Sequence, residues 1–202
     1  MSQNFDIVKI IFYNLNGQIT GGYMKQKAWA KTLLSIYTCL ENISNAIDKY
    51  VVAQGVASGR NNLTTIESAE RIINLIQRKK LMINIKVLIE KSIANLDTES
   101  ARILVMRFVD KVKPEVCTQI LNYSRRTYFR RLDKSIESFA TNIKHQGIDE
   151  NILQTMFKKE GWVLEIYQNF LKQKQKDVDF KLDAIPDYKQ SSLIKLKHCN
   201  AY

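Results

Sequence analysis

The chain has 202 residues, with 31 Lys and Arg against 20 Asp and Glu, a formal net charge of +11 and a sequence pI near 9.5. Its hydrophobic fraction of 45% is sufficient for a buried core, which excludes wholesale disorder. Only 7 Gly and 2 Pro are present, so turns are scarce, and an all-α fold is predicted in place of a sandwich, a barrel or a collagen-like chain.

Residues 1–24 are predicted to be a leader that precedes the main helical body. Apolar residues have helical spacing here, but Gly17 and the Gly21-Gly22 pair interrupt it. Two interpretations remain open: a short appended helix, or an extension from an upstream start codon.

Residues 25–96 are predicted to form a helical hairpin that serves packing or dimerisation. The first helix, over residues 25–51, is indicated by apolar residues that alternate steps of four and three, the spacing of a heptad seam. These residues are Trp29, Leu33, Ile36, Leu40, Ile43, Ile47 and Tyr50. A glycine-containing loop over residues 51–62 follows. Thr64 and Glu67 then have the spacing of a capping box, which starts a second helix that reaches about Leu96.

The two helices either fold back as an antiparallel hairpin or pair with another copy of the chain as a homodimer. The run Arg78-Lys79-Lys80 lies within the second helix. It is either an ordinary solvated face or a patch that binds phosphate or a partner.

The excess positive charge lies in the middle of the chain. Residues 71–140 hold 15 Lys and Arg against 7 Asp and Glu, which is +8 of the net +11. Charge placed inside periodic apolar segments indicates a folded basic surface, not a basic tail. Such a surface suits an anionic partner such as nucleic acid.

Residues 97–146 have the pattern of a helix-turn-helix. Asp97 is a predicted N-cap of a helix that ends near residues 109–113. Pro114 disfavours a helical residue before it and fits the first turn of a short helix that runs to Leu121. A tight turn and a further helix complete the pattern.

The helix after this turn is predicted to have two different faces. Asn122 tolerates a left-handed backbone at the turn, and Ser124 can cap the helix. On a helical wheel, the apolar face is formed by Tyr128, Leu132, Ser135, Ile136 and Phe139, whereas the basic face is formed by Arg126, Arg130, Lys134 and, toward its edge, Arg131. Arg125 lies in the first turn, and Phe129 lies between the faces. We expect the apolar face to pack inward and the basic face to be free for a DNA major groove.

Residues 96–139, LDTESARILVMRFVDKVKPEVCTQILNYSRRTYFRRLDKSIESF, resemble the C-terminal promoter-reading helix-turn-helix of bacterial RNA polymerase sigma factors, their region four. They are also similar to the phage-type late-transcription activators of the ArpU class. The matching parts are Ala101-Arg102-Ile103-Leu104 with Arg107-Phe108, Glu115 to Leu121, and Ser124-x-x-Thr127-Tyr128-x-x-Arg131-Leu132. The resemblance covers about 44 of the 202 residues.

The resemblance implies roles for the basic helix. It places Arg125, Arg126, Phe129 and Arg130 against base edges or nearby backbone, with Ser124 at the start of the helix. It assigns phosphate contacts to Arg131 and Lys134. RNA polymerase is the further partner that it implies. The segment before the motif lacks the aromatic-rich basic helix with which sigma factors melt DNA. A sigma-like regulator is therefore favoured over a divergent complete sigma factor.

Residues 147–202 are predicted to be a C-terminal helical appendage and tail. Gly147 ends the basic helix, and two helices follow. The first contains Ile152, Leu153, Met156 and Phe157, and the second contains Trp162, Ile166 and Phe170. The tail from Asp177 is expected to be irregular.

Catalytic chemistry has few candidate residues in this sequence. Cys39, Cys117 and Cys199 are far apart and are interpreted as small buried thiols. His145 and His198 have no spaced metal-ligating or triad partners, and no phosphate-binding glycine loop occurs. We therefore expect no enzyme activity, no cofactor and no metal. No apolar run approaches the roughly 20 residues that span a bilayer, so a soluble cytoplasmic protein of bacterial or phage origin, associated with the nucleoid, is expected.

The sequence thus predicts a sequence-specific, double-stranded-DNA-binding transcription regulator. The alternative is a helical interaction adaptor whose helix-turn-helix is a degenerate remnant. RNA binding is disfavoured because no aromatic strand motif for base stacking is present.

Overall fold

A computed structural model describes the backbone of residues 3–57 and 64–172, with side chains described for residues 25–55 and 64–172. Every regular element in these ranges is helical, which confirms the all-α prediction. Among the described residues, no helix contains an apolar segment that could span a bilayer. The expectations for the tail from Asp177 and for Cys199 and His198 lie outside the described residues.

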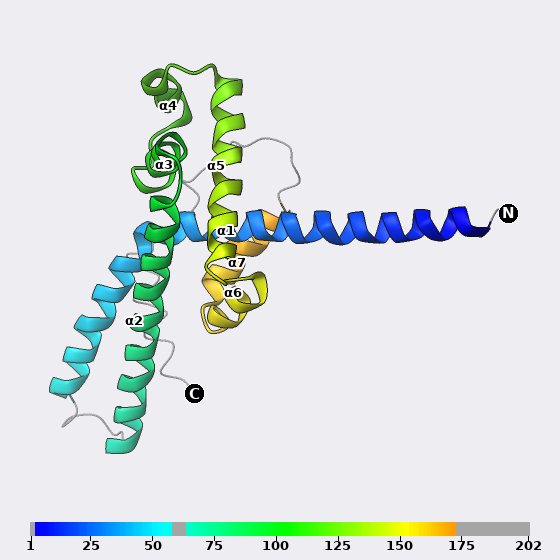
Figure 1. The fold of residues 1–202 in the computed structure, drawn as a ribbon. Coiled ribbons are helices and arrows are strands. Elements are labelled where there is room, and N and C mark those ends of the chain that lie inside the picture. Colours follow the sequence, from blue (N-terminus) through cyan, green and yellow to red (C-terminus); the bar gives the residue numbers. More distant parts are fainter. Residues whose placement is uncertain (1–2, 58–63, 173–202) are drawn as a thin grey trace.

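Helix α1, Gln3–Ala57, is the central element of the fold. It contacts α2, α5, α6, α7 and the π-helical turn η1. Its N-terminal part extends beyond the other helices, and its C-terminal part turns to lie beside α2 (Figure 1). The predicted heptad seam is confirmed at six of its seven positions: Trp29, Leu33, Ile36, Leu40, Ile43 and Ile47 are buried, whereas Tyr50 is only partly buried.

The predicted boundaries of this helix were wrong at both ends. The backbone is helical through Gly17 and Gly21-Gly22, and it continues past the predicted end at residue 51, through Gly55, to Ala57. A glycine costs about 1 kcal/mol in a helix interior, but extending an existing helix costs far less than nucleating a new one. The packed seam supplies that nucleus. The rest of the predicted loop, residues 58–63, lies outside the described residues.

Helix α2, Thr65–Ala94, folds back antiparallel along α1, so the predicted hairpin forms within one chain. The capping box is confirmed: the Glu67 amide donates to Thr64 Oγ1 at 3.3 Å, and the Thr64 amide donates to Glu67 Oε2 at 2.8 Å. Three polar pairs fix the register. They are Tyr37 with Glu90, Glu41 with Lys86 and Asp48 with Lys79.

The remaining helices build a bundle on this frame. Their bounds are α3 Thr98–Leu104, η1 Val105–Val109, α4 Pro114–Leu121, α5 Arg125–His145, α6 Glu150–Met156 and α7 Gly161–Lys172. Trp29 joins α1 to the C-terminal helices, because its ring stacks on Tyr167 at 4.2 Å and on Phe157 at 5.9 Å between centroids. Trp162 is buried, as predicted, whereas the predicted apolar position Ile152 is 42% exposed.

Candidate nucleic-acid interface

The helices α3, α4 and α5 form a three-helix unit in which α3 and α4 both pack on α5. Asp97 caps α3, since its carboxylate accepts the Ser100 amide at 2.9 Å, as predicted. This hydrogen bond holds the pKa of Asp97 below its ordinary value, because it stabilises the charged carboxylate. The cap therefore fixes where the unit begins.

The connection from α3 to α4 contains a π-helical turn that sequence analysis missed. The Asp110 amide donates to the Val105 carbonyl, and the Val112 amide donates to the Met106 carbonyl, both at 2.9 Å. Lys111 then adopts a left-handed backbone with φ 54°. Pro114 opens α4 where predicted, since the first turn of a helix needs no amide donor there.

The turn between α4 and α5 has the predicted geometry. Asn122 ends α4 in the left-handed region, with φ 52° and ψ 46°. The Tyr123 amide donates to the Thr118 carbonyl at 3.0 Å, which satisfies one of the open carbonyls at the end of α4. Ser124 then caps α5 by accepting the Thr127 amide at 3.2 Å.

The inner face of α5 is the predicted one. Tyr128, Leu132, Ser135, Ile136 and Phe139 are all buried. The Tyr128 hydroxyl lies deep beside the Cys117 thiol, and its pKa is raised mainly because burial disfavours the phenolate. Cys117 is a small buried thiol, as expected, while Cys39 is only partly buried.

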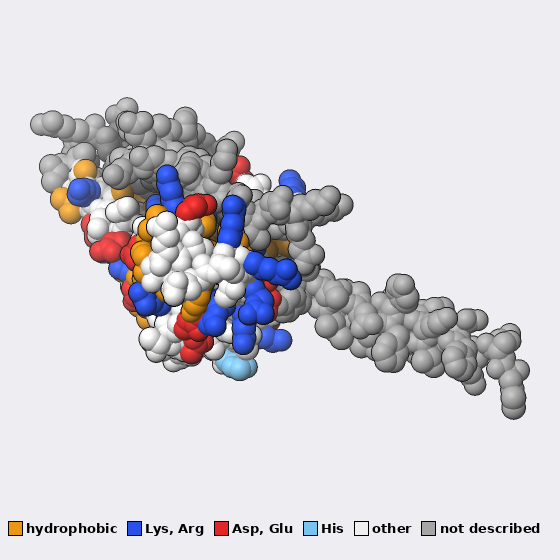
Figure 2. All heavy atoms as spheres, turned by 90° about the horizontal axis from the view of Figure 1, so that it is seen from above, with side chains coloured by type: hydrophobic (Ala, Val, Ile, Leu, Met, Phe, Trp, Pro, Cys, Tyr) orange, Lys and Arg blue, Asp and Glu red, His pale blue; other side chains and the backbone are white. Residues whose placement is uncertain are grey.

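The outer face of α5 carries exposed positive charge. Arg125, Arg126, Arg130 and Lys134 are all exposed, and Lys and Arg side chains gather at the end of the molecule where α4 meets α5 (Figure 2). Phe129 is half-buried at the boundary of this face, and the Arg125 guanidinium lies 5.8 Å from its ring centroid. The start of α5 therefore presents exposed cations beside the Phe129 ring.

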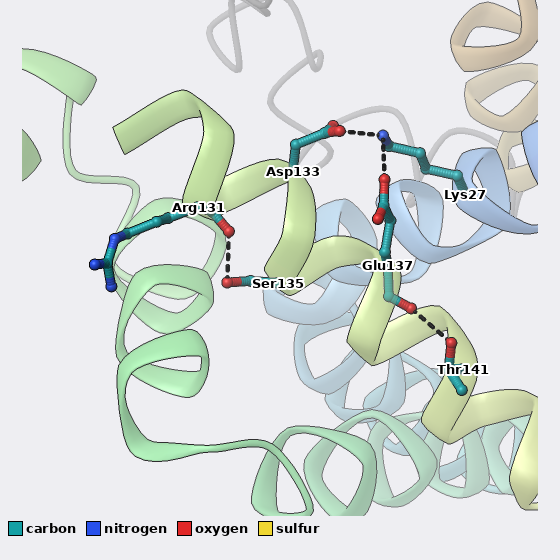
Figure 3. A network of polar contacts seen from close by, with 6 residues as sticks. All are labelled: Lys27, Arg131, Asp133, Ser135, Glu137 and Thr141. Carbon is teal, nitrogen blue, oxygen red and sulfur yellow. Dashed lines mark hydrogen bonds and ion pairs between the residues drawn. The ribbon is translucent and has the colours of Figure 1, made fainter. Parts of the chain in front are cut away.

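Arg131 differs from the other predicted site residues. Its guanidinium pairs with Glu99 of α3, which also accepts a hydrogen bond from the Tyr123 hydroxyl. The guanidinium also stacks on the Tyr123 ring, 4.7 Å from the centroid. Arg131 and Lys27 lie on opposite sides of α5 (Figure 3). The structure thus makes Arg131 a bridge between α3, the turn and α5.

Lys27 of α1 makes a contact with α5 that the sequence did not reveal. Its ammonium contacts Asp133 Oδ2 at 2.5 Å and Glu137 Oε1 at 3.2 Å (Figure 3). Asp133 and Glu137 are the acidic residues of α5. Because Lys27 engages both, it ties α1 to α5 through the two acidic side chains of α5.

Hydrogen bonds from the other end of α5 reach the hairpin. The Gln146 side chain donates to Ser92 Oγ at 2.7 Å, and the Asn142 side chain donates to the Ser92 carbonyl at 3.1 Å. Gln26 donates to the Ala140 carbonyl at 3.1 Å. These contacts join α5 to α1 and α2, so the basic face has a fixed orientation relative to the whole body.

The run Arg78-Lys79-Lys80 does not form a single basic patch. Arg78 pairs with the buried Glu160, and Lys79 pairs with Asp48 at 2.6 Å. Lys80 is exposed on α2. Two of the three cations therefore hold helices together within the chain.

No family model, curated protein or solved structure matches the chain. Within the described ranges, no three His, Cys, Asp or Glu side chains gather as a metal ion would require.

Proposed function

We propose that the protein is a sequence-specific DNA-binding regulator of transcription that reads promoter DNA through α5. The observation that carries the proposal is the pairing of a capped, left-handed turn with a helix whose inner face is buried and whose outer face presents Arg125, Arg126, Arg130 and Lys134. A helix held in this way can enter a major groove with its first turns against the bases.

The roles of the basic residues follow from their positions. Arg126 and Arg130 are four residues apart and so lie on one face, close to the start of α5, where a guanidinium can make a bidentate contact with guanine. Lys134 lies one turn further on and suits a backbone phosphate. Phe129 is placed to contact a thymine methyl group. Arg131 has a positioning role in this proposal, because it already pairs with Glu99.

The face is also favourable for nonspecific attraction. Exposed cations that bind phosphates displace counterions from duplex DNA, so affinity is expected to fall steeply as salt rises. Lys27 supports the proposal because its ion pairs with Asp133 and Glu137 offset the negative charge of these two carboxylates. Contact with RNA polymerase belongs to the same proposal and rests on the resemblance of residues 96–139.

The test is fluorescence anisotropy with the full chain on promoter fragments of the source genome, at several salt concentrations. An unrelated duplex of equal length and base composition is the control. We expect tight binding to a subset of the fragments and salt-dependent binding to all of them. Absence of affinity at low salt, or equal affinity for every duplex, would overturn the proposal.

A further inference from the structure

Helix α2 carries a second apolar stripe, on the side away from α1. The stripe is formed by Ile66, Ile73, Ile76, Ile83 and Val87, which are 72%, 53%, 52%, 44% and 40% exposed. The residues that α2 buries, Met82, Ile85, Leu88 and Ile89, lie on the opposite side of the helix. The stripe is therefore additional to the packing that closes the hairpin.

The spacing of the stripe is that of a coiled-coil seam. Ile66, Ile73 and Val87 fall on one heptad position with Lys80, and Ile76 and Ile83 fall on the other with Ala69. A stripe over residues 66–87 is about 33 Å long, at a rise of about 1.5 Å per residue. A second helix of similar length can cover it.

The charges beside the stripe favour a second copy of α2 as that helix, in antiparallel orientation. Glu70 lies near one end and Lys91 near the other, both exposed and on the same heptad position. Antiparallel pairing brings Glu70 of one chain toward Lys91 of the other, twice by symmetry. Parallel pairing would instead set Lys80 against Lys80 in the seam.

The cations on the other flank do not oppose this pairing. Lys79 and Lys86 are held by Asp48 and Glu41 of the same chain. The hairpin also projects from the end of the molecule opposite to α4 and the start of α5 (Figure 1). Pairing through α2 therefore leaves the basic face of α5 uncovered.

We propose that the protein is a homodimer in which the exposed stripes of two α2 helices pack antiparallel, so that the two hairpins form a four-helix assembly. This inference does not depend on the proposed DNA binding, because it is measured without DNA.

The first test is the mass of the full chain by sedimentation equilibrium over a wide concentration range. The expected result is a species of twice the 23.5 kDa chain mass. Ile76→Glu and Ile73→Glu should each raise the dimer dissociation constant at least tenfold. Ile152→Glu, at a similarly exposed isoleucine on α6, is the matched control and should leave it unchanged. A monomeric wild type, or a dimer that persists in both stripe variants, overturns the proposal. A monomeric wild type would indicate that the stripe binds a partner of different sequence.

The second test addresses orientation. Glu70→Lys and Lys91→Glu should each weaken the dimer several-fold, because each places like charges together. The double variant should restore the dimer, since it exchanges the two charges. Circular dichroism on every variant checks that the helices are retained. Failure of the double variant to restore affinity would overturn the antiparallel arrangement.

Discussion

The buried carboxylate of Glu160 accepts two hydrogen bonds from Arg78, at 2.5 Å from Nε and 2.8 Å from Nη2. It also accepts a hydrogen bond from the Trp162 indole, with 2.8 Å between Nε1 and Oε2. Because the Glu160 side chain is only 4% exposed, its charge depends on these partners. The contact ties α2 to the start of α7.

Arg78→Ala should therefore destabilise the fold by about 3 kcal/mol, since it leaves a buried carboxylate without its cation. Urea unfolding followed by circular dichroism measures this change. Lys159→Ala, which removes an exposed cation next to Glu160 in the sequence, is the control and should change stability by less than about 0.5 kcal/mol. Equal losses of stability in the two variants would contradict a stabilising role for the ion pair between Arg78 and Glu160.

Asn122 should tolerate glycine better than alanine. Its left-handed backbone costs a residue with a Cβ atom about 1–2 kcal/mol, and glycine avoids that cost. We expect Asn122→Gly to match or exceed the wild type in stability, and Asn122→Ala to lose about 1 kcal/mol. Thermal unfolding of the three proteins decides this, and the reverse order of stabilities would rule out the turn described here.

The cap at Asp97 should make stability depend on pH. The pKa of Asp97 is lowered in the folded chain by the Ser100 amide, so its stabilising effect is full above the unfolded pKa, about 3.9, and is lost as pH falls through the folded value.

Asp97→Asn keeps a capping side chain that does not titrate. The stability of the wild type relative to Asp97→Asn should therefore decline as the pH is lowered below about 4, in urea titrations at a series of pH values. A difference that stays constant with pH would show that the Asp97 charge contributes nothing. At neutral pH, Asp97→Ala should cost about 1 kcal/mol.

Arg131 and Arg130 are neighbours with different expected roles. Arg131→Ala should lower stability by about 1 kcal/mol, because it removes a half-exposed ion pair with Glu99 and the stacking on Tyr123. Arg130→Ala should leave stability unchanged and weaken DNA binding. A double-mutant cycle of Glu99→Ala with Arg131→Ala measures the coupling. Additive effects in that cycle would count against the bridge.

The two ends of the proposed DNA-binding face should also differ. Arg126→Ala should weaken binding to a preferred site by about 1–3 kcal/mol and relax sequence preference. Lys134→Ala should weaken binding to all sequences alike and reduce the slope of log affinity against log salt concentration by about 1. Lys144→Ala is the control, since Lys144 lies about 27 Å from Arg126 and about 15 Å from Lys134 along the axis of α5. Binding by the full chain that is insensitive to both Arg126→Ala and Lys134→Ala would place the interface elsewhere.

The local features of this protein follow from short stretches of its sequence. The heptad seam from Trp29, the capping box at Thr64, the cap at Asp97 and the left-handed turn at Asn122 were predictable, because each depends on residues within a few positions of one another. The two faces of α5 were predictable for the same reason. The continuation of α1 through its glycines was not, since helix propagation is stabilised by packing elsewhere.

Contacts between residues far apart in the chain determine which charges are already paired within the protein. Lys27 and Asp133 are 106 positions apart, and Arg78 and Glu160 are 82 apart, so no local pattern indicates that they pair. These contacts remove Arg78 from the predicted patch and pair the two acidic residues of α5 with Lys27 of α1. The tertiary structure also showed that α2 has apolar residues on two sides, and that α1 covers only one of them.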